Sequence, residues 1–300
     1  CGGFGDYLGD FLSEKIKVTN LALPGETAKS YYNTPQYTEF INSLSEGDYV
    51  FIAFGANEGN STDRNKYSMP SGNETTANAY AKYIYSYYVK PALDKNAVPI
   101  LLTPQAKRRV SGEDFAIPDD PYVKSVTDLV VSQGLFFVNL NDITKELYTS
   151  MGVEGSKVIN AYDRVNGITE NTYSKFGART VARKIINSCK FSSASLKDYI
   201  SDDKLNNSSY MKKADFVYMI MDVLNYGDKA TQNFIDVPQG KYYFNAIAVA
   251  KKYGLVSADK DGNFMPESEM NNAFMRSFLD KVIKASGKNI SISDISKDDV

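Results

Sequence analysis

The 300-residue chain contains no histidine and no tryptophan, and it has only two cysteines, Cys1 and Cys189. Without an imidazole group, this chain has no histidine base and no histidine metal ligand, and it cannot assemble a Cys/His zinc site. Cys189 continues an apolar helical stripe, so we expect a buried, inert thiol. A Cys1–Cys189 disulfide is the alternative.

Net charge and long apolar runs are also scarce. The formal net charge is −2, so no basic field indicates a nucleic-acid partner. No apolar run is long enough to predict a transmembrane segment. The composition, 43% hydrophobic and 23% charged, is typical of a globular protein with one large domain or two. The chain begins at Cys1 with a helical pattern directly after it, which we interpret as a fragment rather than a lipidated N-terminus.

Strand and helix patterns alternate as far as residue 190. Strands are expected at 17–22, 49–54, 98–103 and 135–140, and helices at about 35–45, 74–95, 119–133 and 174–189. Strands separated by helices predict a parallel sheet of at least four strands, covered on both faces. Three polar loops follow the strand ends and should meet at one edge of the sheet, where ligands bind in such folds: 23–27, 55–65 and 103–114.

The pattern changes after residue 190. Residues 191–210 are rich in Ser, Asp and Asn and are the predicted linker between a domain at 1–190 and a helical domain at 211–300. Helices are expected from Phe216, at 245–253 and at 272–285. The segments YMKKADFVYMIMDVL and EMNNAFMRSFLDKVI begin similarly, which indicates an internal repeat of roughly 60 residues.

Five stretches carry a resemblance to a known family: GFGDYLGDFL, VTNLALPGETAKSY, GDYVFIAFGANEGN, PILLTPQAKRRV and SKFGARTVARKI. In this order they resemble the SGNH (GDSL) hydrolases, within the rhamnogalacturonan acetylesterase-like branch. The resemblance implies a flavodoxin-like three-layer α/β/α fold with a parallel sheet and no cofactor. It also implies removal of acetyl groups from plant cell-wall polysaccharide by a Ser nucleophile, a His base and an Asp that orients the His.

Part of that machinery is replaced in this sequence. The resemblance places Gly25 and Asn57 at the family's oxyanion-hole positions, although Asn57 also suits a simple turn. The segment TENTYSKFGA puts Thr169 and Thr172 where the family has its Asp and His. A Thr hydroxyl is not a base near neutral pH. The family's Ser block lies upstream of GFGDYLGDFL, and the chain begins after that point.

Other polar residues of the three loops are candidates for substrate binding. Glu58 follows Asn57 directly, and Arg108 and Arg109 follow the third strand, where they suit a uronic acid carboxylate or plain solvation. Replacement bases would have to come from Glu26, Glu58, Asp163 or Glu170, each more typical of a solvated loop carboxylate. The tyrosine-rich helix at 79–88 suggests sugar stacking, but its spacing favours packing on the sheet.

The last 100 residues resemble an S-layer homology (SLH) module, a small all-α domain. The segments KKADF and FIDVPQGKYYFNAIAVAKKYGLVSADKDGNFMPESEM carry this resemblance. It implies binding of a bacterial secondary cell-wall polymer, with Lys213 and Asp215 in the family's binding segment. Asp259, Asp261 and Asn263 also suit a dockerin-like calcium loop, but Met270 stands where an oxygen ligand is needed, so a structural turn is favoured.

These observations lead to three hypotheses for an extracellular, cell-wall-associated protein. The first is a carbohydrate esterase whose Ser lies outside this chain. The second is a pseudoenzyme that binds acetylated polysaccharide without cleaving it, and the third is a cell-wall scaffold anchored by SLH repeats. The replacement of the histidine by Thr172 favours the second hypothesis for the chain as given.

Overall fold

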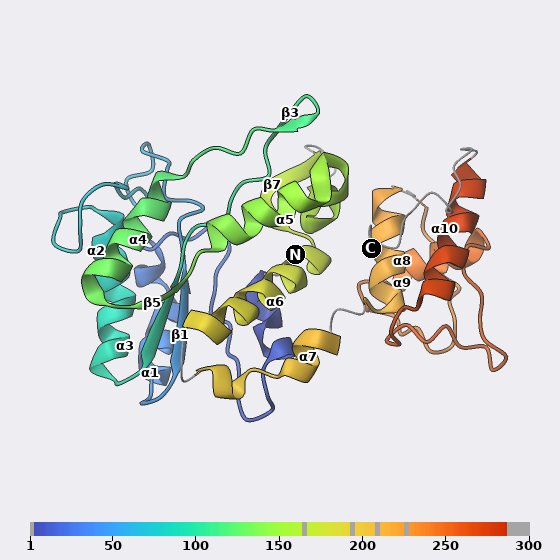
Figure 1. Ribbon diagram of the computed structural model, residues 1–300, viewed down its shortest axis with the longest axis horizontal. Coiled ribbons are helices and arrows are strands. Elements are labelled where there is room, and N and C mark those ends of the chain that lie inside the picture. Colours follow the sequence, from blue (N-terminus) through green and yellow to red (C-terminus); the bar gives the residue numbers. More distant parts are fainter. Residues whose placement is uncertain (1–2, 164–166, 193–195, 208–210, 225–227, 287–300) are drawn as a thin grey trace. The chain divides into compact units, whose positions relative to one another are not determined.

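The computed structural model describes residues 3–163, 167–192, 196–207, 211–224 and 228–286 (Figure 1). The chain divides into two units, Cys1–Leu205 and Asn206–Val300. The division falls within 191–210, the predicted linker. Cys1, the alternative disulfide partner of Cys189, lies outside the described residues.

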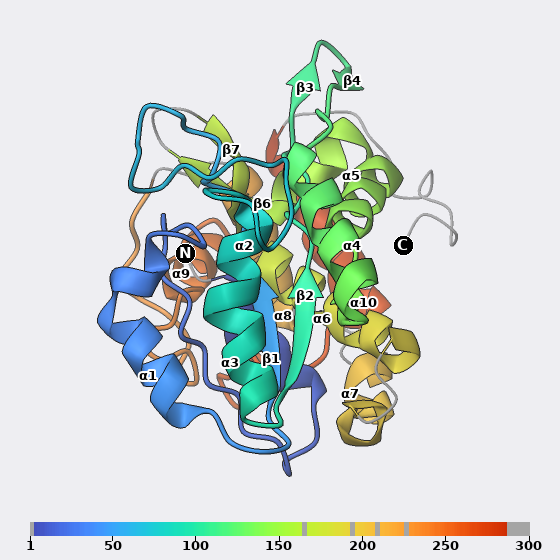
Figure 2. The ribbon, with the colours of Figure 1, turned by 90° about the vertical axis from the view of Figure 1, so that its left-hand side faces the viewer.

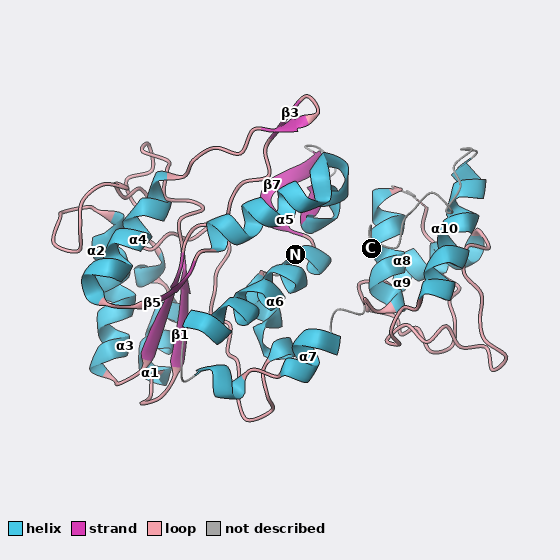
Figure 3. Cartoon of the chain, viewed as in Figure 1, coloured by secondary structure: helices cyan, strands magenta, loops and turns pink. Residues whose placement is uncertain are grey.

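A parallel sheet forms the centre of the first unit. It contains β1 (Tyr49–Ala53), β2 (Val98–Leu102) and β5 (Phe136–Val138) in the order β1-β2-β5 (Figure 3). The predicted α/β class and three of the predicted strands are therefore confirmed. The fourth predicted strand, 17–22, is wrong, and so is the expectation of four strands. Among the described residues β1 pairs with β2 alone, so residues 17–22 have no partner for a hydrogen-bonded ladder.

Helices cover both faces of this sheet. On β2, Ile100 and Leu102 join a core cluster with α6 (Lys175–Ser192). Leu101 between them joins a cluster with α2 (Tyr80–Ile84) and α4 (Pro121–Gln133). This alternation follows from the two-residue period of a strand. In Figures 1 and 2, α1 to α4 lie on one side of the strands and α6 on the other. The arrangement is the expected α/β/α layering.

The remaining elements of the first unit connect these layers. The helix expected at 74–95 is divided into α2, a π-helical segment and α3. A further helix, α5, was not predicted. The bounds are η1 (Phe4–Phe11), η2 (Tyr31–Asn33), α1 (Pro35–Ser43), α2 (Tyr80–Ile84), the π segment (Tyr85–Val89), α3 (Lys90–Asp94), β3 (Val110–Ser111), β4 (Asp114–Phe115), α4 (Pro121–Gln133), α5 (Leu140–Gly155), η4 (Ser156–Ile159), β6 (Asn160–Asp163), β7 (Gly167–Tyr173), η5 (Leu196–Tyr199) and α7 (Asp202–Asn207).

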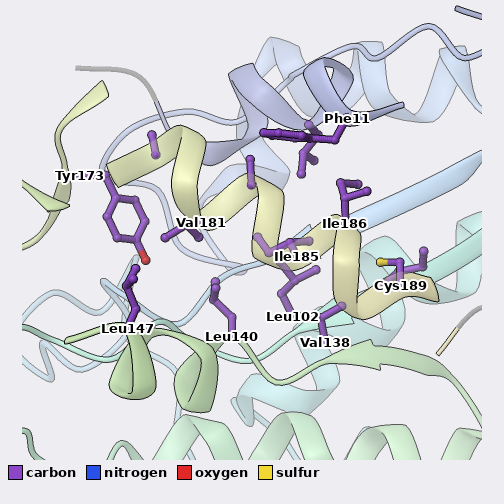
Figure 4. Close-up of a cluster of buried hydrophobic side chains, with 14 of the residues drawn as sticks. Phe11, Leu102, Val138, Leu140, Leu147, Tyr173, Val181, Ile185, Ile186 and Cys189 are labelled. Atoms are coloured by element: carbon purple, nitrogen blue, oxygen red, sulfur yellow. The ribbon is translucent and has the colours of Figure 1, made fainter. Parts of the chain in front are cut away.

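The apolar stripe of α6 lies at the centre of the larger core (Figure 4). Ile185 and Cys189 have no exposed surface, which confirms that the Cys189 thiol is buried. Leu196 and Leu205, from the predicted linker, are also buried in this core at 1% and 3% exposure. Segment 196–205 is therefore part of the packed first unit. The polar composition of 191–210 indicated a linker, but two of its leucines belong to the core.

The second unit contains α8 (Lys213–Val223), α9 (Phe244–Lys252) and α10 (Asn272–Ser286), close to the predicted helices. Their core includes Phe216, Ile247 and Phe278. The chain just before α8 pairs with the chain just before α10, since the Met270 amide donates to the Met211 carbonyl at 2.8 Å. Across the residues that the structure describes, no helix has both the length and the apolarity needed to cross a bilayer.

Candidate functional site

Two of the three predicted loops meet directly at the carboxyl edge of the sheet. The Asn57 side-chain amide donates to the Glu26 carbonyl at 3.1 Å, next to Gly25. Gly25 has a φ of +77°, and both Gly25 and Asn57 are exposed. An Asn amide has two hydrogens. One orients the Asn57 side chain on the first loop, and the other is available to an oxygen of a ligand.

The buried Glu58 side chain links the same two loops. Its side chain has no exposed surface, and its carboxylate accepts the backbone N–H groups of Ala28 and Asn57, each at 3.0 Å. Burial raises the pKa of Glu58, although the backbone N–H donors act in the opposite direction. The prediction that Glu58 contacts substrate does not agree with this burial, because its oxygens face the backbone. Glu58 instead positions the backbone at Asn57 and at Ala28 of the neighbouring segment.

The series of loops continues to β7. Gly55 lies so close to the next loop that a Cβ atom on it would be 2.2 Å from Pro104 Cγ. In turn, the Gln105 amide donates to the Asn171 carbonyl, and the Arg108 backbone N–H donates to the Glu170 carbonyl at 2.7 Å. The edge therefore runs without interruption from the loop of Gly25 through Asn57 to the strand that contains Thr172.

The two arginines expected to bind substrate have different environments. Arg108 is 7% exposed and donates from Nε to Ser156 Oγ at 2.9 Å and from a terminal nitrogen to the Val153 carbonyl at 2.5 Å. Burial lowers the pKa of its guanidinium group. A substrate-binding role for Arg108 does not agree with this geometry. Arg109 is half exposed and forms a two-point ion pair with Glu170, closest at 2.8 Å, so a uronate would have to compete with Glu170.

Thr169 and Thr172 lie on β7. Thr172 is exposed, and Thr169 Oγ1 donates to the carbonyls of Ala161 and Thr172, at 3.0 and 2.8 Å. Thr169 is thus used in local backbone contacts of the β6–β7 pair. Neither hydroxyl supplies a base, so the two positions can form polar contacts with a ligand but cannot activate a serine.

Sequence patterns did not reveal two further groups at this edge. Lys66 Nζ donates to the Gly25 carbonyl at 2.7 Å across 41 positions of sequence, and no local pattern indicates such a contact. Ser30 donates to the Glu26 carboxylate and also accepts the Thr27 backbone N–H at 3.0 Å. The Ser30–Glu26 contact spans four positions, so a Glu-x-x-x-Ser spacing in a turn is the signal that would have identified it.

Comparison with known proteins identifies the family of the first unit. Residues 2–216 match the model of the GDSL-like Lipase/Acylhydrolase family. The chain belongs to this family. Two relatives come from Bacillus subtilis (strain 168): the probable rhamnogalacturonan acetylesterase YesY, 25% identical over 63% of this chain and 83% of that protein, and the rhamnogalacturonan acetylesterase RhgT, 25% identical over 66% and 84%.

Two further comparisons cover less of the related protein. A rhamnogalacturonan acetylesterase from Emericella nidulans is 31% identical over 123 residues, which are 40% of this chain and 48% of that protein. The crystal structure of the Bacillus subtilis protein YXIM superimposes with a TM-score of 0.54 at 21% identity, over 63% of this chain and 50% of that one. This last likeness shows the fold alone, and it supports the expected SGNH hydrolase architecture. No comparison supports the SLH module.

In the second unit, the predicted wall-binding residues contact aromatic rings. Lys213 Nζ lies 5.3 Å from the centroid of the Phe274 ring, and Asp215 accepts the Tyr242 hydroxyl. Phe274 belongs to the second copy of the suspected repeat. The Asp259 carboxylate caps its own turn by accepting the backbone N–H groups of Asp261 and Asn263, each at 2.9 Å. Within the described ranges, His, Cys, Asp and Glu form no group of three that could hold a metal ion.

Proposed function

We propose that the first unit binds acetylated pectic polysaccharide of the rhamnogalacturonan class and does not hydrolyse it with the groups in this chain. The main support is the pairing of an oriented, exposed Asn57 amide with a threonine at position 172. The amide can donate to an acetyl carbonyl, whereas Thr172 cannot remove a proton from a nucleophile. The names of the relatives supply the class of polymer.

A binding role agrees with the way the edge is constructed. Glu58 fixes both loops, so the Asn57 amide is positioned before any ligand arrives. Loss of a triad base lowers turnover by on the order of 10⁴-fold or more, but it leaves ligand binding available. The chain therefore retains the part of an acetylesterase site that recognises the ester and has replaced the part that transfers the proton.

The test of this proposal measures binding and acetate release together. Affinity electrophoresis on acetylated and saponified rhamnogalacturonan should show tighter binding to the acetylated polymer, and Asn57→Ala should remove this preference. Asn187→Ala, an exposed Asn on α6, is the matched control and should retain it. Acetate release should not exceed background. Acetate release that Asn57→Ala abolishes would overturn the non-catalytic assignment, and equal binding of both polymers would overturn the acetyl site.

We further propose that the second unit attaches the protein to an anionic bacterial cell-wall polymer outside the cell, as an SLH-like module. The observation that favours this function is the Lys213 ammonium group held over Phe274, close to the Asp215–Tyr242 contact. A single lysine on a partly exposed face gives weak, salt-sensitive binding. Slight pelleting with purified wall sacculi at low salt, lost in Lys213→Ala, is expected. Salt-resistant pelleting of that variant would refute the Lys213 site.

A further inference from the structure

Four tyrosines form a continuous aromatic surface on the first unit. This tyrosine platform consists of Tyr32, Tyr37, Tyr83 and Tyr87. Tyr32 stacks on Tyr87 with ring centroids 4.1 Å apart and an interplanar angle of 18°. Tyr37 lies against Tyr32 at 4.8 Å, and Tyr83 lies against Tyr87 at 5.7 Å. Tyr32 is 43% exposed, and the other three rings are half-buried.

The platform rings lie at the margin of the core cluster that contains Tyr80 and Tyr88, and Tyr87 contacts Tyr88 with ring centroids 6.5 Å apart. Tyr80 and Tyr88 are buried in this cluster, as the sequence pattern predicted, whereas Tyr83 and Tyr87 pack against it and are only partly buried. The π-helical segment Tyr85–Val89 lies between α2 and α3, and such segments recur at functional sites. The packing interpretation of the tyrosine-rich helix therefore holds for one face only.

Three of the four platform hydroxyls are available to a ligand. Among the described residues, the hydroxyls of Tyr32, Tyr37 and Tyr87 have no hydrogen-bond partner, while Tyr83 donates to Asn78 Oδ1 at 3.1 Å. Tyrosine offers a large, rigid surface with an apolar face and a polar edge. A pyranose ring has the complementary form, with C–H groups on its faces and hydroxyls around its edge.

The platform continues from the candidate site through one loop. Lys66 attaches that loop to the Gly25 carbonyl. Two residues before it, the Arg64 carbonyl accepts Lys29 Nζ at 2.7 Å, and this same ammonium group lies 5.6 Å from the centroid of the Tyr83 ring. Tyr32 follows Lys29 by three residues at the start of the platform. One loop therefore contacts both Gly25 of the candidate site and Lys29, whose ammonium group lies over the Tyr83 ring of the platform.

We infer that the tyrosine platform binds successive sugar rings of a pectic polysaccharide chain whose acetylated residue occupies the Asn57 site. This inference rests on the proposed function for the identity of the polymer. The platform recognises the ring faces of the backbone, so its contribution does not depend on acetyl groups. The Asn57 site and the platform therefore contribute separately: one gives the preference for acetylated polymer, and the other gives general affinity for the chain.

The experiment uses the full chain in affinity electrophoresis on saponified rhamnogalacturonan, with acetylated polymer in parallel. Tyr32→Ala and Tyr87→Ala should each weaken binding to both polymers by about fivefold or more. Tyr32→Phe, which keeps the ring, should bind nearly as well as wild type. Tyr253→Ala, at a comparably exposed Tyr of the second unit, is the control and should not change binding. Thermal unfolding of each variant identifies a loss that comes from misfolding.

The outcomes separate this inference from the proposed function. Unchanged binding of folded Tyr32→Ala and Tyr87→Ala would overturn the platform and leave the acetyl site standing. Tyrosine-dependent binding without any preference for acetylated polymer would support the platform and overturn the acetyl site. Failure of the wild type to bind either polymer would overturn both. Equal weakening by Tyr32→Phe and Tyr32→Ala would show that the hydroxyl acts rather than the ring face, against the stacking assignment.

Discussion

Glu58 offers the sharpest test of how the candidate edge is held together. The carboxylate is fully buried and accepts two backbone N–H groups, from Ala28 in the first loop and Asn57 in the second. In Glu58→Ala, both donors lose their acceptor inside the protein. Glu58 contacts these loops at the backbone, so the substitution should loosen the loops without removing any group proposed to contact a ligand.

The expected cost follows from those two bonds. Hydrogen bonds to a charged group contribute about 1.5–3 kcal/mol each, which gives about 3–6 kcal/mol for the pair. Removing a buried charge recovers part of this sum, because burial disfavours the ionised carboxylate and raises its pKa. We therefore expect Glu58→Ala to lower the free energy of unfolding of the first unit by about 2–4 kcal/mol at neutral pH.

Chemical denaturation measures this difference, and hydrogen exchange locates it. Exchange of the Ala28 and Asn57 amides should accelerate in Glu58→Ala, whereas amides of β2 should change only with global stability. Asp94→Ala is the matched control: Asp94 is an exposed carboxylate paired with Lys90 at 2.7 Å, and its loss should cost less than about 1 kcal/mol. A Glu58→Ala chain within about 0.5 kcal/mol of wild type, with unchanged exchange at Ala28, would refute the reasoning.

Four further outcomes follow from the same structure. Burial raises the pKa of Glu58 in the folded state above the ordinary value of 4.5 that applies when the chain is unfolded. Wild type should therefore lose stability relative to Glu58→Gln as pH rises from 4.5 to the folded-state pKa, and denaturation at a series of pH values measures this loss. Arg108→Ala should destabilise by about 2–4 kcal/mol, whereas Arg109→Ala, which removes an exposed ion pair, should have a much smaller effect. Gly55→Ala should cost about 2–4 kcal/mol, since φ is +115° and Pro104 blocks a Cβ. Cys189, with a pKa raised by burial to about 12, should react with thiol reagents only after unfolding.

The sequence predicts what depends on local pattern. Buried parallel strands are continuous apolar runs, so β1, β2 and β5 were recognisable, and so was the stripe of α6 that buries Cys189. The failures involve partners distant in sequence. Residues 17–22 have the composition of a strand, but none of the described strands pairs with them. Composition alone cannot reveal whether a pairing partner is present.

The difference between local patterns and distant partners also explains which features of the candidate site the sequence predicts. Asn57 lies at the carboxyl edge because it follows β1, a strand that the sequence predicts. Gly25 follows no strand among the described residues, and its place beside Asn57 is known from the Asn57–Glu26 hydrogen bond. The roles of Glu58 and Arg108 depend instead on burial. Both follow strand ends in polar loops, where exposure is the usual outcome, yet Glu58 bonds to the backbone across 30 positions and Arg108 bonds to Ser156 across 48. No local spacing shows that a loop charge turns inward.

The contacts that hold Asn57 are independent of the residue at position 172. Asn57 is held by Glu26 and Glu58, and those contacts need neither a serine nor a histidine. Thr172 stands at the exposed end of β7, and its side chain has no hydrogen bond within the described residues. The residue type at position 172 does not affect the Asn57 network, because none of the described bonds of that network involves residue 172. A fold with this division can keep an oriented amide without a base beside it, which is the physical basis of the polysaccharide-binding role that we propose.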